Sequence, residues 1–168
     1  TALVIAGLTA CSTAPASSSA DCTPLVSGGS TSTAVQVSPN LGEDPDVSFT
    51  GPLTGTVSEA TTAVVGSGAV VTEDSIPTVT FSIYDGKTGD EITSTGTDQP
   101  TLATALAAQA PVIGDALQCA SAGSRLVVTL SPDDAAPLVQ AFSGYGVAAG
   151  APLVVAIDVH SGVPSVAT

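Results

Sequence analysis

Positive charge is nearly absent from this sequence. Lys87 and Arg125 are the only lysine or arginine residues among 168, and fifteen acidic side chains bring the formal net charge to −13. A surface of that sign is repelled by the phosphate backbone of nucleic acids and by anionic lipid headgroups. Nucleic acid is therefore excluded as a partner.

The residue combinations of most catalytic centres are missing as well. The chain has no nucleophile elbow, phosphate-binding loop, dinucleotide fingerprint or zinc-protease motif, and its single histidine, His160, makes a Ser-His-Asp arrangement hard to assemble. The cysteines and His160 lack the spacing of metal ligands. An acidic turn at Glu43, Asp44 and Asp46 invites interpretation as a calcium loop, but without the ligand spacing of an EF-hand it favours a solvated turn. We expect no cofactor and no metal ion.

No hydrophobic run reaches the length of about 20 residues that a membrane-spanning helix needs. Residues 1–11, TALVIAGLTAC, are typical of the end of a signal peptide, and Leu8-Thr9-Ala10-Cys11 resembles a bacterial lipobox, in which the cysteine carries the lipid. Residues 12–32 are rich in small and polar residues and predict a flexible tether. We expect lipidation at Cys11 and an extracytoplasmic protein that is lipid-anchored to the bacterial cell membrane. An ordinary secretory signal with a chance cysteine is the alternative.

Two cysteines remain if Cys11 carries a lipid. In an oxidising compartment an even pair of thiols usually forms a disulfide, so we expect Cys22 to bond to Cys119. Such a bond would tie the N-terminal arm to the main domain.

Alternating apolar residues predict most of the strands. The expected strands are 78–84, a return strand beginning near Glu91 after an Asp-Gly turn, 125–130 and 152–159. Residues 33–57 are expected to form an N-terminal arm that adds edge strands at 33–37 and 46–49. Helices are expected at 102–108 and 114–119, and the glycine-rich segment 132–150 is expected to be a long functional loop. This combination predicts an α+β fold.

The stretch Ala122–Asp133 organises the chain. It combines a Gly-Ser turn that carries Arg125, a strand with Leu126, Val128 and Leu130 on one face, and a Ser131-Pro132 pair suited to capping a short helical turn. These residues are similar to the central strand of FKBP-type peptidyl-prolyl cis-trans isomerases.

Four further motifs occur in the order expected for that family. They are Val64 to Gly68, Val79 to Ser82 with Asp85-Gly86-Lys87, Val112-Ile113-Gly114, and Leu153 to Val159. The resemblance covers residues 58–161 and implies an FKBP-like antiparallel half-barrel sheet wrapped around a short helix. Residues 162–168 are interpreted as a linker or a cut C-terminus.

The resemblance also implies which residues form the site. Catalytic roles fall on Phe81, Ile113, Phe142 and Tyr145, and substrate contacts on Ile92, Thr93, Val112 and Ile157. Phe81 and Phe142 take the positions of tyrosines, the backbone amide of the Val112-Ile113 pair would receive the substrate carbonyl, and Tyr145 would supply the hydroxyl that Phe142 lacks. Plain core packing is the alternative for Phe81, Ile92 and Ile157, and Asp158 and His160 are expected to be solvated residues at the end of a strand.

The sequence also departs from the family at the floor of the pocket. The tryptophan floor of the pocket is absent, and the chain is short by two or three residues between Gly114 and Leu117. We therefore expect an FKBP-like isomerase or folding helper of weak activity that acts on proline-containing polypeptides outside the cytoplasm. A non-catalytic polypeptide-binding or structural module of the same fold is the alternative.

Overall fold

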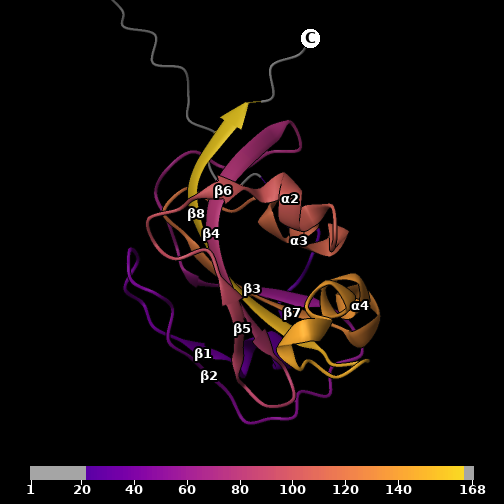
Figure 1. The fold of residues 1–168 in the computed structure, drawn as a ribbon. Helices are drawn as coiled ribbons and strands as arrows, with labels where there is room; N and C mark the ends of the chain where they lie inside the picture. Colours follow the sequence, from indigo (N-terminus) through magenta and orange to yellow (C-terminus); the bar gives the residue numbers. More distant parts are fainter. Residues whose placement is uncertain (1–21, 165–168) are drawn as a thin grey trace, which may run out of the picture.

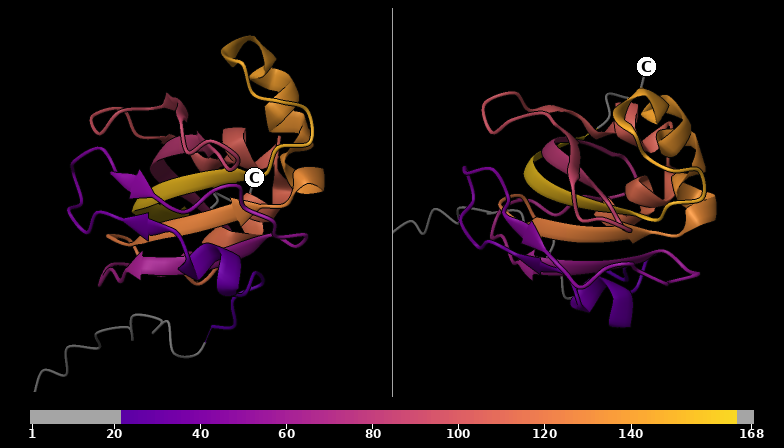
Figure 2. Two further views of the ribbon diagram at one scale, coloured as in Figure 1. Left: turned by 90° about the horizontal axis from the view of Figure 1, so that it is seen from below. Right: turned by 60° about the horizontal axis from the view of Figure 1, so that its bottom comes forward.

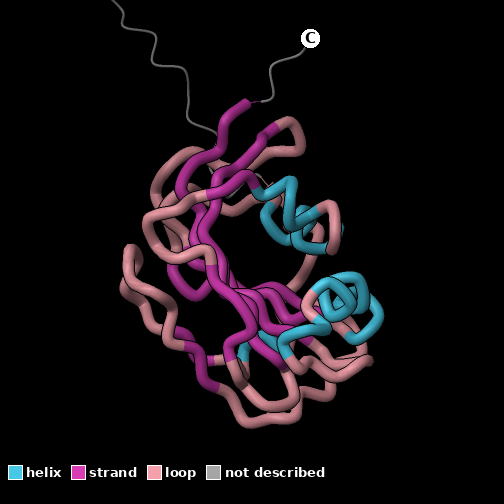
Figure 3. The backbone as a smooth tube through the Cα atoms, in the orientation of Figure 1, coloured by secondary structure: helices cyan, strands magenta, loops and turns pink. Residues whose placement is uncertain are grey.

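A computed structural model describes residues 22–164 of the chain. An antiparallel six-stranded sheet forms its centre, with helices α2, α3 and α4 on one face and a small two-stranded sheet against the other (Figures 1, 2 and 3). The lipobox and the tether up to residue 21, and the end of the chain from residue 165, lie outside the described residues. Within the described part, no helix is both long and apolar enough to cross a membrane.

The main sheet has the strand order β3-β7-β8-β4-β5, and β6 pairs separately with β4. Its strands are β3 (Glu59–Val64), β4 (Ser75–Asp85), β5 (Glu91–Ser94), β6 (Thr101–Leu102), β7 (Arg125–Leu130) and β8 (Leu153–Pro164). The strands predicted at 78–84, near Glu91, at 125–130 and at 152–159 are confirmed. Together with the few short helices, this sheet confirms the predicted α+β half-barrel.

Both faces of the sheet are covered, which explains why β7 is buried along its whole length. Leu126, Val128 and Leu130 belong to the larger apolar cluster, which the helices join, whereas Val127 joins a smaller cluster with the N-terminal arm. The alternation along residues 125–130 therefore separates two cores rather than a core from solvent.

The helices are short except for one. They are α1 (Ser30–Thr33), α2 (Ala103–Ala107), α3 (Pro111–Leu117) and α4 (Pro132–Ala141), followed by the 3-10 helix η2 (Ser143–Tyr145). The α2 helix confirms the one predicted at 102–108. The second predicted helix begins earlier than expected because Pro111, at a first-turn position, starts it.

The prediction of a long loop over 132–150 is wrong for its first half. Ser131 caps α4, and its hydroxyl accepts a hydrogen bond from the Asp134 amide at 3.3 Å. Asp133 and Asp134 lie in the first turn, where negative charge stabilises a helix. The Ser131-Pro132 pair predicted only a short helical turn, whereas the helix that it starts continues for ten residues.

The N-terminal arm forms a layer of its own. Strands β1 (Gln36–Val37) and β2 (Val47–Ser48) pair only with each other among the described strands, so the prediction that they add edge strands to the main sheet is wrong. Instead, the arm packs through Val35 against Val127 and Val154 on the sheet face opposite the helices. Its apolar side chains are better buried there than at a solvated edge.

Arg125 holds this arm in place. Its side chain is fully buried, and its Nε and Nη2 groups donate hydrogen bonds to the two carboxylate oxygens of Asp158, each at 2.6 Å. Nη1 donates to the carbonyl of Ser38 at 2.7 Å, and Nη2 to the carbonyl of Glu43 at 3.0 Å. The expectation that Asp158 is solvated is wrong, because Asp158 is the buried partner of the arginine. His160 is exposed, with Nε2 2.9 Å from the Thr80 hydroxyl.

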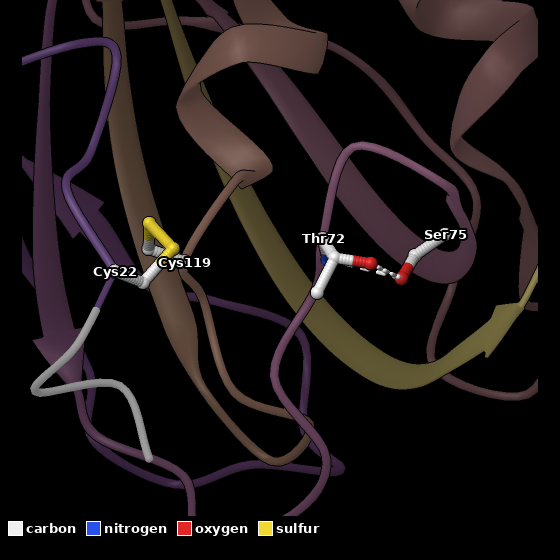
Figure 4. Close-up of a disulfide and its surroundings, with 4 residues drawn as sticks. All are labelled: Cys22, Thr72, Ser75 and Cys119. Carbon is white, nitrogen blue, oxygen red and sulfur yellow. Dashed lines mark hydrogen bonds between the residues drawn. A yellow bond between two sulfur atoms is a disulfide. The ribbon is translucent and has the colours of Figure 1, made fainter. Parts of the chain in front are cut away.

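The disulfide between Cys22 and Cys119 confirms the predicted pairing (Figure 4). It joins residues 22–29, called the strap below, to the turn that follows α3. The strap runs beside the outer edge of the main sheet, where the Ala60 amide of β3 donates a hydrogen bond to the Ser27 carbonyl at 3.1 Å. Close to this turn, Thr72 and Ser75 close a hydrogen-bonded turn ahead of β4 (Figure 4).

Tyr84 gives the contact between arm and sheet a dependence on pH. Its buried hydroxyl donates to the Pro45 carbonyl at 2.7 Å and lies 3.2 Å from Glu91, and burial, followed by the charge of Glu91, raises the pKa of Tyr84 to about 12. Folding therefore favours the neutral phenol. This stability is fully present below pH 10, the ordinary pKa, and is lost as the pH rises toward 12.

We therefore predict that the free energy of unfolding falls by about 2–3 kcal/mol between pH 9 and pH 12 from this group alone. Urea unfolding of the parent and of Tyr84→Phe at several pH values measures the difference, since the variant lacks the ionisable group. Tyr145→Phe is the matched control, because Tyr145 is 68% exposed. A Tyr84→Phe variant with the same pH dependence as the parent would contradict the assignment.

Candidate functional site

A groove of about 550 Å³ opens on the face of the sheet that carries the helices. The sheet contributes Phe81 from β4 and Ser94 from the end of β5, and the helices contribute Leu106 from α2 and Leu138 from α4. The remaining lining residues are Thr95, Gln99, Pro100, Thr101, Ala105, Gln109 and Phe142. No charged side chain lines the groove, although the chain as a whole carries a net charge of −13.

Local structure fixes the two phenylalanines of the groove. The Phe81 backbone is held on both sides by Thr95, whose hydroxyl accepts its N–H at 3.0 Å and whose N–H donates to its carbonyl at 3.0 Å. Phe142 lies at the end of α4, where its N–H donates to the Leu138 carbonyl. Its ring packs edge-on against that of Tyr145, with centroids 5.8 Å apart.

The predicted site residues divide into two groups. Phe81 and Phe142 line the groove, and Tyr145 lies beside it through its contact with Phe142. The residues predicted to contact substrate do not line the groove. Ile157 is fully buried as the cross-strand neighbour of Phe81, and Ile92 packs against the core. Thr93 pairs with Ile83 in the sheet, and Val112 lines a different hollow. Their predicted substrate contacts remain predictions.

The position of Ile113 bears on the role that the family resemblance implies for its backbone amide. Its side chain is fully buried, and its amide donates to the Ala110 carbonyl at 2.9 Å in the turn that starts α3. In the role implied by the family resemblance, this amide would receive the substrate carbonyl. That role would require the intrachain hydrogen bond to break first.

Two buried leucines, Leu106 and Leu138, also line the groove, and neither was predicted as a site residue. Leu106 lies in the helix predicted at 102–108, in which Leu102 is 49% exposed. Leu138 was missed because its helix was predicted to be a loop. The amide side chains of Gln99 and Gln109 were also missed, and no sequence signal distinguished them.

A curved antiparallel sheet that holds short helices and a groove on one face is the FKBP-like fold. A peptidyl-prolyl cis-trans isomerase from Pseudomonas syringae pv. tomato has this arrangement. It superposes with a TM-score of 0.50 at 18% identity, over 62% of this chain and 74% of its own. A multi-domain immunophilin from Arabidopsis thaliana gives a TM-score of 0.50 at 17% identity, over 76% of this chain and 48% of its own.

At these identities the similarity establishes the fold. No family model matches the sequence, and no curated protein sequence matches it either.

Proposed function

We propose that this domain is an FKBP-like folding helper that binds proline-containing polypeptides in the groove and isomerises X-Pro bonds weakly. The observation that carries the proposal is that Phe81 and Phe142, two aromatic residues far apart in sequence, line one uncharged groove in this fold. Isomerisation needs no nucleophile, since its barrier of about 18–20 kcal/mol is the loss of amide resonance. A site that removes water from the imide and favours its twisted form lowers that barrier.

The same groove supports weak rather than full activity. Its described lining contains no tryptophan, and Phe142 offers no hydroxyl to a substrate. The Ile113 amide already has a partner in Ala110. Each hydrogen bond missing from a transition state costs about 1–3 kcal/mol, so two missing bonds reduce the rate by roughly 30- to 2 × 10⁴-fold.

We predict that the purified domain accelerates proline-limited refolding of a model protein only slightly, and that Phe81→Ala abolishes the acceleration. Val65→Ala is the matched control, because Val65 is 77% exposed and does not line the groove. A refolding rate near that given by an FKBP domain with a full aromatic pocket would contradict the proposal of weak activity. Activity that survives Phe81→Ala would place the reaction outside this groove.

Binding without turnover is the second candidate, and the hydrogen bond between the Ile113 amide and Ala110 favours it. In that case an X-Pro peptide perturbs the NMR signals of Phe81 and Phe142 while its isomerisation rate stays at the uncatalysed value. A peptide that binds and also isomerises faster identifies the enzyme.

We also propose that Cys11 anchors the protein to the outside of the cytoplasmic membrane. The disulfide between Cys22 and Cys119 supports an oxidising compartment, and Leu8-Thr9-Ala10-Cys11 supplies the lipobox pattern. Cys11→Ser, made in the complete precursor, should move the protein from the membrane fraction to the soluble fraction, whereas the control Ser12→Ala should stay with the membrane. Unchanged fractionation of Cys11→Ser would contradict the anchor.

A further inference from the structure

A second hollow of about 500 Å³ lies apart from the groove and shares no lining residue with it. The strap forms one wall, the residues around the start of β3 another, and helices α3 and α4 the remainder. Its lining includes the aliphatic residues Leu25, Val57 and Val112 and the acidic residues Glu59, Asp115 and Asp134. We call this feature the acidic hollow.

Apolar side chains lie open to solvent in the acidic hollow. Leu25 is 60% exposed and Val57 is 69% exposed, and half-buried Val112 lines the same space. Single exposed aliphatic residues are common on protein surfaces, but several that line one concavity are typical of a binding surface.

Three carboxylates, Glu59, Asp115 and Asp134, line the hollow beside these apolar residues. Glu59 accepts the Ser32 amide at 2.8 Å, and one oxygen of Asp134 accepts the hydroxyls of Ser58 and Ser131. The donors are an amide and two hydroxyls, so these hydrogen bonds position the two carboxylates without supplying a counter-charge.

Within residues 22–164, no cationic side chain lines the hollow. The described lining contains neither Lys87 nor Arg125. Arg125 is fully buried and paired with Asp158. Within residues 22–164, the exposed Asp115 carboxylate takes part in no hydrogen bond or ion pair. The hollow therefore presents uncompensated negative charge next to exposed apolar surface.

We infer that the acidic hollow binds a segment of another polypeptide in which lysine or arginine alternates with aliphatic residues. Such side chains lay their apolar stems along Leu25 and Val57 and place the charged head among the carboxylates. Charge-assisted hydrogen bonds to carboxylates are stronger than neutral ones, and electrostatic complementarity also selects against acidic segments. The uncharged groove offers no such selection, so this site is independent of the proposed isomerase function.

A fluorescein-labelled peptide of leucine, alanine and lysine tests the inference by fluorescence anisotropy at low salt. We expect saturable binding that is lost when glutamate replaces lysine in the peptide. Asp115→Asn is expected to weaken binding by about two- to fivefold, the range that exposed ion pairs give, and Leu25→Ser and Val57→Ser to weaken it as well. These positions are exposed, so the variants are expected to fold like the parent.

Two matched controls separate this site from the general acidity of the protein. Asp90→Asn removes the same charge from an exposed position in the turn between β4 and β5, and Val65→Ser makes the same kind of apolar change elsewhere. Neither control should change the affinity by as much as the hollow variants do. The inference is overturned if Asp90→Asn weakens binding as much as Asp115→Asn, if the glutamate peptide binds equally well, or if Phe81→Ala abolishes binding of the lysine peptide.

Discussion

Asp158→Asn is expected to lower the free energy of unfolding by about 3–5 kcal/mol, because it leaves the guanidinium of Arg125 buried without its counter-charge. Both groups lie inside the protein, with Arg125 fully buried and Asp158 7% exposed. A paired buried arginine tolerates this environment because the two carboxylate oxygens accept two of its N–H groups at 2.6 Å. Urea unfolding measures the loss.

A double variant separates two effects of Arg125, its buried charge and its hydrogen bonds to the N-terminal arm. Arg125→Met with Asp158→Leu removes both charges, so it should recover much of the stability that the single variant loses. It also removes the donors to Ser38 and Glu43, so the amides of residues 36–48 should exchange with solvent faster than in the parent.

Asp90→Asn, the same chemical change at an exposed position, should alter stability by no more than about 0.5 kcal/mol. If Asp158→Asn changes the free energy of unfolding as little as this control does, the buried ion pair does not stabilise the fold by the amount that we predict.

Removal of the disulfide is expected to have an effect of similar size. The bond joins residues 97 apart in sequence, and a cross-link over a loop of that length stabilises a protein by about 4–5 kcal/mol in the chain-entropy model. Cys22→Ala with Cys119→Ala, in a Cys11→Ser background, should therefore unfold at a clearly lower urea concentration. The backbone amides of the strap should lose protection from hydrogen exchange before those of the main sheet.

Reduction supplies the control for this pair of substitutions. A thiol reductant should lower the stability of the Cys11→Ser protein to that of the alanine variant and should leave the alanine variant unchanged. Equal unfolding midpoints for the oxidised protein and the alanine variant would show that the cross-link does not constrain the unfolded chain.

Much of the sheet could be predicted because its signals are local. The alternation along 125–130 and the turn at Asp85-Gly86 depend only on neighbouring residues, and the structure contains this strand and this turn. The disulfide followed from counting thiols. In both cases the physical cause acts within a short segment or on very few candidates.

The errors arose where distant residues decide the outcome. Asp158 was expected to be solvated because nothing near it in sequence signals burial, and its partner Arg125 lies 33 residues away. The arm was predicted to extend the sheet because strand propensity does not say which surface a strand covers. The glycines at positions 144, 146 and 150 obscured α4, although its capping residues had been recognised.

The site was predictable only in part for the same reason. Phe81 and Phe142 came from motif positions, and the structure brings both to one groove. Leu138 depends on a helix that was not predicted, and the hydrogen bond from the Ile113 amide depends on how the turn at Ala110 closes. Neither could be derived from residue type and spacing.

The position of β8 has a consequence for synthesis on the ribosome. This strand, at the end of the described chain, lies between β7 and β4, and every residue of β4 is paired with it. Until residues 153–164 leave the exit tunnel, the β3-β7 pair and the strands around β4 have no shared neighbour that could join them into one sheet. The growing chain therefore holds valine-rich strands without their central partner, a state prone to aggregation. A nascent chain that stalls before residue 153 should therefore be recognised by chaperones that bind exposed apolar segments.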